Sequence, residues 1–200
     1  MAQNRRNLRR QIFAIAASQG GYFTAAQARE IGYSYQAQAH HVQVGNWIRI
    51  ERGLFRLREW IPEPGDDLRR WTVWSKGRAV VSHESALAVH EIGEFESPRI
   101  HLTLPPDFRK KDAALTIHRA SLGEEDVMEQ KGFAATTPLR SIIDVAAGAP
   151  DEDQLARAIG EAVEGGLVTR RKLRVRAEQV DPRAALYVER AIQLTESTSV

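Results

Sequence analysis

The stretch from residue 22 to residue 58 constrains the fold more than any other feature, because its local pattern changes repeatedly within a short span. Thr24 is a good helix N-cap, and Gly32 stands where a left-handed residue ends a helix. Ser34 is placed to cap a second helix. Two runs of alternating apolar and charged residues then flank Gly53, as hairpin strands do. Helix, turn, helix and basic hairpin together predict a winged helix-turn-helix, whose second helix enters the major groove of DNA.

Charge is distributed unevenly along the chain. Up to residue 60 there are nine arginines against three glutamates, a formal charge of +6. The remainder carries 19 basic and 23 acidic side chains, a formal charge of −4, so the total of +2 hides the contrast. A cationic first part followed by a mildly anionic remainder is typical of a protein that touches phosphates with one end.

Composition excludes several classes of protein. The chain is 42% hydrophobic and 27% charged, which is ordinary for a globular protein. It has no cysteine, which excludes a disulfide framework and a thiolate metal site and fits a reducing cytosol. No apolar run approaches the roughly 20 residues of a transmembrane helix. We therefore expect a cytoplasmic protein with no membrane partner.

The clearest break in composition is the Pro- and Gly-containing segment from Glu63 to Asp67. It predicts a DNA-binding domain at 1–62 and a second domain at 67–200. For the second domain we predict helix over 68–92, strands at 99–105 and 115–119, a strand pair around Gly132, a helix from Thr137, and helices near 151–164, 169–178 and 182–194. The predicted fold class is α+β: a winged helix-turn-helix, then a mixed α/β domain with a small antiparallel sheet and C-terminal helices.

Several of these segments together are similar to a known family. They are Phe23-Thr24, Ile31-Gly32, Gly45–Leu57, Val81–Leu87, Ile100–Pro105, Thr116–Arg119 and Gly132–Asp144. In this order and spacing, over roughly residues 8 to 175, the chain resembles the AbiEi family of bacterial antitoxins, the transcriptional-regulator half of abortive-infection AbiE toxin–antitoxin pairs. The resemblance implies an N-terminal winged helix that binds inverted repeats in double-stranded DNA upstream of its own operon. It also implies a C-terminal domain that opposes a nucleotidyltransferase-fold toxin, directly or indirectly.

The candidate DNA contacts lie on the second helix of the motif, on the hairpin and in the N-terminal segment. Gln pairs bidentately with adenine, so the helix can read bases if Ala37, His41 and Val44 face inward. Hairpin arginines suit phosphate or the minor groove, and Arg52 beside the turn is the strongest candidate. A solvated polar helix and an ordinary charged hairpin remain the alternative. The candidates are Ser34, Tyr35, Gln36, Ala39, His40 and Gln43 on the helix, Arg49, Arg52 and Arg56 on the hairpin, and Arg5 and Arg9 before them.

The densest basic run of the chain covers residues 170–176. Thr169 is placed to cap a helix there, with Leu173 and Val175 turned inward. This helix is either a second contact with DNA, a contact with an acidic partner surface, or a solvated face. The candidate residues are Arg170, Arg171, Lys172 and Arg174.

Two patterns raise the question of catalysis or metal binding. Glu129-Gln-Lys131, with Asp112 or Asp126 upstream, matches the loose Glu-x-Lys element of nucleases that hold Mg²⁺. The element leads into an apparent turn between strands, so we expect no catalytic residues and no enzyme. A possible metal cluster contains His83, His101 and His118 with Glu84, but the two strand histidines also fit the polar face of a sheet. We therefore expect no metal and no cofactor.

Three functions follow from these patterns. The first is a DNA-binding antitoxin that represses its own operon and counteracts a toxin. The second is a protein-interaction adaptor whose winged helix binds another chain and no DNA, which the neutral polar second helix makes credible. The third, with the least support, is a restriction-type nuclease.

Overall fold

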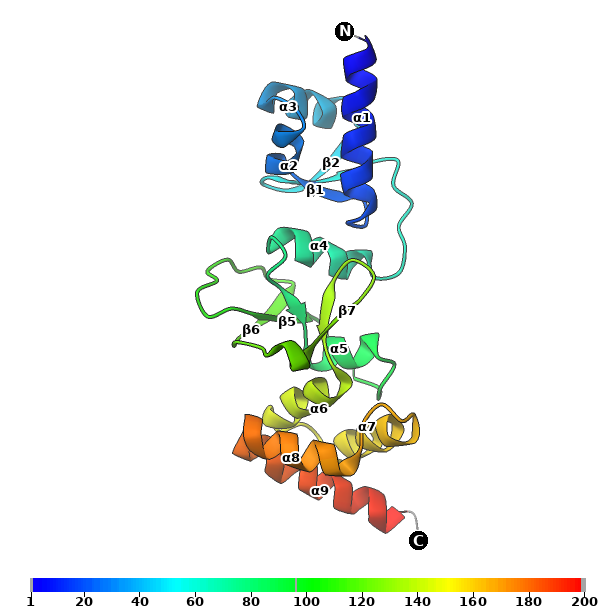
Figure 1. The fold of residues 1–200 in the computed structure, drawn as a ribbon, viewed down its shortest axis with the longest axis vertical. Coiled ribbons are helices and arrows are strands. Elements are labelled where there is room, and N and C mark those ends of the chain that lie inside the picture. The colour runs from blue at the N-terminus through cyan, green and yellow to red at the C-terminus, as the bar shows by residue number, and fades with distance from the viewer. Residues whose placement is uncertain (1, 96, 199–200) are drawn as a thin grey trace. The chain divides into compact units, whose positions relative to one another are not determined.

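The computed structural model describes residues 2–95 and 97–198, which fold into two compact units (Figure 1). The first unit runs to Arg78 and takes in Lys131–Phe133. The second comprises Ala79–Gln130 and the chain from Ala134 onward. None of the described helices is long and apolar enough to cross a membrane. The mixture of helices and strands confirms the predicted α+β class.

The first unit is built from helices around a three-stranded antiparallel sheet of order β1-β3-β2. The two helices and the hairpin match the sequence prediction, whereas β1 was not predicted. The elements are α1 (Ala2–Ala17), β1 (Tyr22–Thr24), α2 (Ala25–Glu30), α3 (Tyr35–Gln43), β2 (Trp47–Glu51), β3 (Leu54–Leu57) and α4 (Asp66–Trp74). Their order is that of a winged helix-turn-helix.

The predicted helix caps are present in the first unit. The Thr24 hydroxyl accepts a hydrogen bond from the Gln27 backbone N–H at 3.1 Å, and the Gln27 side chain accepts one from the Thr24 N–H at 2.8 Å. This reciprocal pair is a capping box, which satisfies two backbone donors that α2 leaves open. The Ser34 hydroxyl likewise accepts from the Ala37 N–H at the start of α3. Local sequence therefore sets where both helices begin.

Aromatic rings fill the core of the first unit. Phe23 of β1 meets Trp47 of β2 edge-on, with ring centroids 4.8 Å apart, and also packs against Phe55 of β3. Ile12 and Ala16 of α1 are buried in the same cluster. Because the core draws on α1 and all three strands, it fixes the hairpin against the helices.

Helix α4 extends the first unit beyond the predicted boundary. The buried Asp66 carboxylate accepts hydrogen bonds from the Trp60 indole at 2.9 Å and from the Glu63 N–H at 2.8 Å, and it pairs with Arg69. Burial alone raises the pKa of Asp66, but these hydrogen bonds outweigh it and hold the pKa below the usual value. Gly21, at φ +82°, approaches the Trp60 ring so closely that a Cβ would lie 2.3 Å from it. These contacts are why the unit continues to Arg78 and does not end near residue 62.

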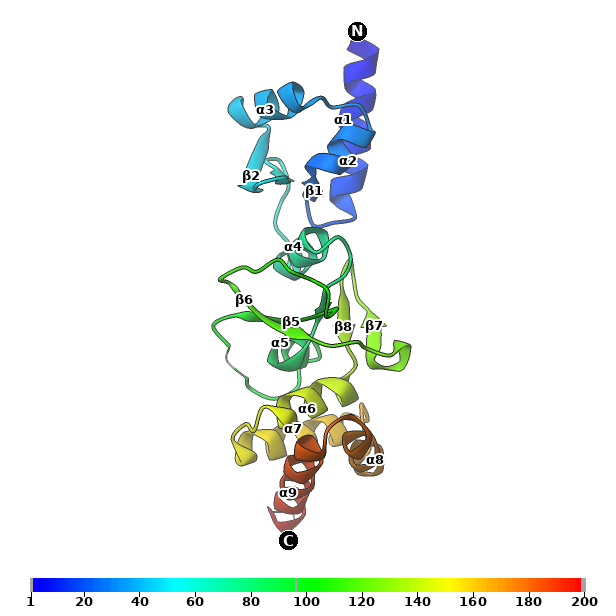
Figure 2. The same cartoon turned by 90° about the vertical axis from the view of Figure 1, so that its left-hand side faces the viewer.

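The second unit contains a five-stranded sheet of order β6-β5-β4-β8-β7 (Figure 2). The strands are β4 (Val80–Val81), β5 (Ile100–Leu104), β6 (Leu115–Arg119), β7 (Val127–Glu129) and β8 (Ala134–Thr136). The sheet is mixed and not antiparallel as expected, because β5 pairs with β6 and β4 with β8 in parallel. The predicted helix over 68–92 is wrong in its middle, where β4 separates α4 from α5 (His83–Val89).

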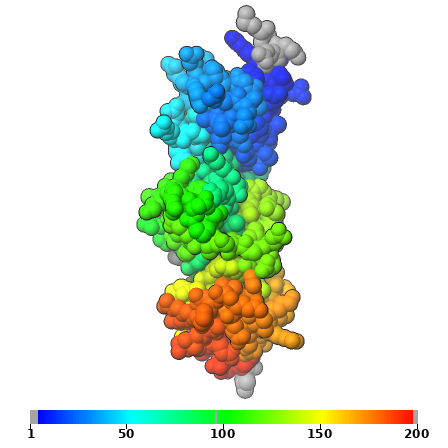
Figure 3. Space-filling view, turned by 60° about the vertical axis from the view of Figure 1, so that its left-hand side comes forward, coloured from blue at the N-terminus to red at the C-terminus, as the bar shows by residue number. Residues whose placement is uncertain are grey.

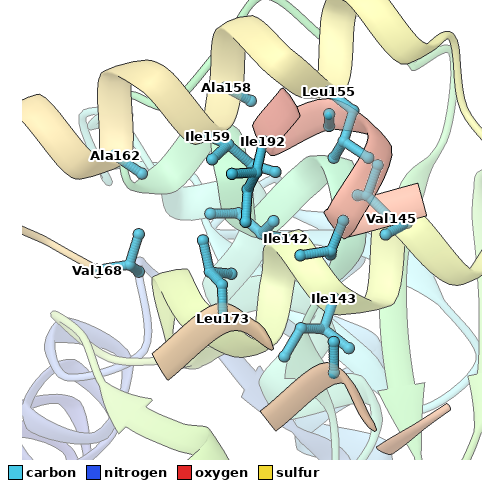
Figure 4. Close-up of a cluster of buried hydrophobic side chains, with 14 of the residues drawn as sticks. Ile142, Ile143, Val145, Leu155, Ala158, Ile159, Ala162, Val168, Leu173 and Ile192 are labelled. Carbon is cyan, nitrogen blue, oxygen red and sulfur yellow. The ribbon is translucent and has the colours of Figure 1, made fainter. Parts of the chain in front are cut away.

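The helices of the second unit form its main core (Figure 4). After a short 3-10 turn, η1 (Glu124–Asp126), the chain forms α6 (Pro138–Ala147), α7 (Glu152–Glu164), α8 (Arg170–Val180) and α9 (Pro182–Thr198). Ile142, Leu155, Ile159, Leu173 and Ile192 are all fully buried where these helices meet. The Thr137 hydroxyl caps α6 and Pro138 occupies its first turn, as the sequence predicted.

A network of buried charges joins the sheet to the helices in the second unit. The Arg140 guanidinium of α6 donates to Asp126 at 2.7 Å and to Asp144 at 2.8 Å. Arg176 of α8 donates to both carboxylate oxygens of Asp126, at 2.8 and 2.9 Å. Burial raises the pKa of Asp144, although Arg140 opposes the shift. Asp126 thus ties η1 to two helices that are distant in sequence.

Candidate nucleic-acid interface

Helix α3 presents one polar, solvent-exposed face. Gln36, Ala39, His40 and Gln43 are all exposed, and their spacing of three and four residues places them on one side of the helix. Gln38, which faces away from this side, is buried. Its side-chain amide donates to the carbonyls of Ala25 and Tyr33, both at 3.1 Å. This buried amide holds α3 against α2 and the turn, so the exposed face belongs to a fixed helix. Figure 3 shows the helical surface of this unit, with α1 in deep blue and α2 and α3 in lighter blue.

The inward face of α3 differs from the expectation at one position. Ala37 and His41 are half-buried, as predicted, but Val44 is 53% exposed. The reason is that α3 ends at Gln43, so Val44 no longer follows the helical face. The sequence analysis did not identify Gln38 as the residue that anchors the helix, because a glutamine gives no apolar signal.

His41 is a structural residue of this helix and not part of the exposed face. Its ring stacks on Trp47 with centroids 4.7 Å apart, and its Nδ1 lies 3.1 Å from the Asn46 amide nitrogen. Burial lowers the pKa of His41, and the neighbouring His40 lowers it further. The neutral ring therefore packs on the core, while His40 remains exposed to solvent.

The hairpin formed by β2 and β3 carries the predicted wing arginines in two different settings. Arg49 and Arg52 are exposed, and no carboxylate among the described residues pairs with either. Arg56 lies on the central strand β3, half-buried, with its guanidinium 5.9 Å from the centre of the Tyr22 ring. The Arg49 guanidinium likewise lies 5.9 Å from the centre of the Phe55 ring, so burial alone separates Arg56 from the two exposed arginines, which are available to a ligand.

The tip of this hairpin is fixed in place. Gly53 has φ +81°, a left-handed conformation that glycine adopts without strain. Its carbonyl accepts a hydrogen bond from the Ala25 N–H, the first residue of α2, at 2.9 Å. A bulge between Arg49 and Glu51 bends β2 just before the tip. The wing and the helix-turn-helix thus share a direct backbone contact.

A hollow of about 780 Å³ in the first unit brings part of the predicted set together. Arg5 and Arg9 of α1, Ser34 and His40 of the helix-turn-helix, and Arg58 after β3 line it. Arg9 forms an exposed ion pair with Glu59 at 2.7 Å, and Arg58 donates to the Gly45 carbonyl at 3.1 Å. The hollow collects three arginines from two segments, with Glu59 also at its edge, and the excess of positive charge suits a phosphate group.

Tyr35 has a partner that the sequence analysis did not identify. The exposed Arg29 of α2 donates to the Tyr35 hydroxyl at 3.1 Å, and its guanidinium lies 4.8 Å from the centre of that ring. The available signals for Arg29 were its positive charge and its place in the last turn of α2. It adds a cation beside the exposed face of α3.

The basic run of α8 is mostly engaged within the second unit. Thr169 caps the helix and Leu173 is buried, as predicted, whereas Val175 is 50% exposed and Ala177 faces inward in its place. Arg174 pairs with Glu189 of α9 at 2.7 Å. Arg170 lies 4.0 Å from Glu196. Only Arg171 and Lys172 of the predicted set are exposed, with no ion pair among the described residues.

The carboxylates of the predicted Glu-x-Lys nuclease element do not come together as metal ligands. Both oxygens of Asp126 accept hydrogen bonds from arginines, so its charge is already neutralised. Asp112 lies in the segment between β5 and β6 and accepts from the Ala114 N–H at 2.9 Å. Glu129 is exposed at the end of β7. The histidines of the other candidate cluster do come together, at the start of α5 and on β5 and β6.

Comparison with known proteins agrees with this description. Residues 10–58 match the family model described as "Transcriptional regulator, AbiEi antitoxin". A crystal structure of the RV2827C protein from Mycobacterium tuberculosis is similar, with a TM-score of 0.60 and 15% sequence identity. The similarity covers 92% of this chain and 77% of that one, and at this identity it supports the fold alone. No curated protein matches the chain.

Proposed function

Because residues 10–58 match the family model of AbiEi antitoxin transcriptional regulators, we propose that this chain binds operator DNA and represses its own operon. The observation that carries the proposal is the exposed face of α3. Its polar side chains lie on one side of a helix that Gln38 fixes from the other side. A polar helix held rigidly at the surface is what insertion into a major groove requires.

In the proposed complex, the two ends of the first unit have different tasks. Gln36 and Gln43 of α3 face base edges, where an amide pairs bidentately with adenine. Arg49 and Arg52 of the wing contact phosphates or the minor groove, and they fix position without reading sequence. Arg5 in the basic hollow contacts a flanking phosphate. Two copies of the chain occupy the halves of an inverted repeat, as paired helix-turn-helix proteins do.

The second unit, in this proposal, gives the protein its antitoxin activity. It counteracts a nucleotidyltransferase-like toxin, either by binding it or by opposing its effect. Arg171 and Lys172 on α8 are the proposed contacts with an acidic partner surface or with a second stretch of DNA, because they are the exposed members of the basic run.

Fluorescence anisotropy with two labelled duplexes tests the DNA-binding proposal. One duplex carries the promoter of the operon and the other is a scrambled duplex of equal length and composition. The promoter duplex should bind more tightly, and the logarithm of its affinity should fall linearly with the logarithm of salt concentration, by about 0.9 for each phosphate contact. No binding to either duplex would support the adaptor function, in which the winged helix binds another protein.

Co-expression tests the antitoxin part separately. The full chain is produced with the product of the adjacent gene, and growth is measured. Restored growth in the presence of the full chain supports counteraction. If growth is not restored although the promoter duplex is bound, the chain is a repressor only.

A further inference from the structure

Three histidines from separate elements converge in the second unit. His83 begins α5, His101 lies on β5 and His118 on β6, and each offers a ring nitrogen within 4.8 Å of those of the other two. The parallel register pairs His101 with Thr116 and Thr103 with His118, so both strand histidines are on the same face of the sheet. The cluster is partly buried and not sealed from solvent.

Two hydrogen bonds, one between backbone groups and one to a serine hydroxyl, fix the start of α5 against β5. The Ser82 N–H donates to the His101 carbonyl at 3.0 Å, and the Ser85 hydroxyl accepts from the His101 N–H at 2.9 Å. His83 and Glu84 stand between these two serines. The cluster is therefore positioned by secondary structure and not by a mobile loop.

The hydrogen bonds of Ser97 determine which nitrogen of His101 carries a proton. The Ser97 hydroxyl donates to the Arg99 carbonyl at 2.8 Å, since a carbonyl can only accept. The same hydroxyl lies 3.1 Å from His101 Nε2, so Nε2 must be the donor in that contact. In the neutral ring the lone pair is then on Nδ1, and Nδ1 is the nitrogen that faces the cluster.

Two other groups approach this lone pair. His118 Nε2 lies 3.2 Å from His101 Nδ1, and Glu84 Oε2 lies 2.8 Å from the same atom. A carboxylate oxygen and an imidazole lone pair repel each other at this distance unless a proton or a metal ion lies between them. Glu84 Oε2 is also buried without a well-oriented hydrogen-bond donor among the described residues. Either a proton on Nδ1, which lets His101 donate to Glu84, or a bound metal ion removes this repulsion.

We infer that these side chains form a binding site for a divalent metal ion of the zinc class: His83, His101, His118 and Glu84. Three imidazoles and one carboxylate are a donor set that suits zinc and is unlike the all-oxygen sets of calcium and magnesium. Zinc–nitrogen bonds of about 2.0–2.1 Å in a tetrahedron place two ligand nitrogens about 3.3 Å apart, close to the observed separation of His101 and His118. The proposed site replaces the sequence-based expectation of no metal.

Two further observations bear on the site. The rings of His83 and His118 are stacked, with centroids 3.4 Å apart, so ion binding requires a small rotation of at least one ring. The Ser97 contact on the far nitrogen of His101 is the outer-shell hydrogen bond that metal-bound histidines usually have.

Calorimetric titration of the chelator-stripped full chain with Zn²⁺ tests the site. We expect one ion per chain. His101→Gln and His118→Gln should each weaken binding by more than about 100-fold, because even the loss of an outer-shell partner costs about 10–100-fold. Ser97→Ala, an outer-shell change, should weaken binding by about tenfold. His90→Gln is the matched control: His90 lies at the end of the same helix, bonded to the Thr136 carbonyl, and its change should leave zinc affinity unaltered.

A measurement on the unmodified chain makes the result independent of how the variants fold. In NMR spectra, Zn²⁺ should shift the ring signals of the three clustered histidines and leave those of His90 in place. Co²⁺ should bind with the visible absorption of a tetrahedral site and be displaced by Zn²⁺. The inference is wrong if the unmodified chain binds no zinc, or if the cluster variants bind it as tightly as the His90→Gln control.

Discussion

The arginines of the first unit and those of α8 are equally prominent in the sequence, but the structure uses them differently. Arg49 and Arg52 are exposed, and no carboxylate among the described residues pairs with them. On α8, Arg174 pairs with Glu189 and Arg176 with the buried Asp126. The first group therefore remains available to an external polyanion, whereas the second already has its counter-charges. A basic run in the sequence is therefore evidence for a nucleic-acid contact only if its side chains are not already paired with carboxylates elsewhere in the fold.

Removing the central carboxylate of the second unit should have the largest effect. Asp126→Ala leaves Arg140 and Arg176 without their shared partner, and breaking a buried pair costs about 3–5 kcal/mol. Urea denaturation should show this loss in the free energy of unfolding. Glu125→Ala, which removes an exposed contact with Arg176, should cost less than about 1 kcal/mol. Equal effects of the two changes would show that Asp126 has no special role in the network.

In the first unit, the corresponding carboxylate is Asp66. Asp66→Asn should destabilise the fold by about 1.5–3 kcal/mol at neutral pH, because it removes charge-assisted hydrogen bonds. The lowered pKa of Asp66 means that its stabilisation is present above the ordinary value of 3.8 and is lost as the pH falls through the folded-state pKa. Thermal unfolding from pH 7 to pH 2 should show a weaker acid dependence in Asp66→Asn. Asp67→Asn, at the adjacent exposed carboxylate, should behave like the unmodified chain.

Changes on the exposed face of α3 should affect DNA discrimination and not stability. Gln36→Ala removes the proposed bidentate contact with a base and should reduce the preference for the promoter duplex by about 1–3 kcal/mol. Affinity for the scrambled duplex should change little, and the melting temperature should be unaltered because Gln36 is exposed. If both duplexes lose affinity equally, Gln36 does not read a base.

The smallest expected change is the loss of one free wing arginine. Arg52→Ala should weaken binding to both duplexes alike and make the slope of log affinity against log salt shallower by about one. Arg174→Ala is the matched control on α8, since its partly exposed ion pair with Glu189 contributes at most about 1 kcal/mol to stability. It should leave DNA affinity unchanged. A loss of DNA affinity in Arg174→Ala similar to that in Arg52→Ala would erase the proposed difference between the two groups.

Local patterns predicted most of the helices and the wing. Thr24, Ser34, Thr137 and Thr169 cap the helices that the sequence assigned to them, because a cap depends on residues within one turn. The hairpin around Gly53 was predicted for the same reason. Helix caps and tight turns, which depend on residues close together in the sequence, can therefore be predicted without knowing the fold.

Features that depend on distant residues were not predictable. β4 is only two residues long, which is too short for a periodic signal. The parallel pairing of β5 with β6 depends on the path of the chain between them, whereas their alternating residues indicated only strands. Likewise, Arg176 and Asp126 are 50 positions apart, so nothing local indicated their pairing. The histidine cluster was considered from the sequence, but only the fold shows that its members converge.

The single hydrogen bond between the Gly53 carbonyl and the Ala25 amide sets a fixed span across the first unit. With the wing tip and the helix-turn-helix joined in this way, the proposed base contacts on α3 and the proposed phosphate contacts on the wing should keep a nearly constant separation. The first unit should then present its two sets of contacts at a constant distance. If the chain binds DNA as proposed, it should distinguish duplexes that carry the same contacted bases but differ in groove width.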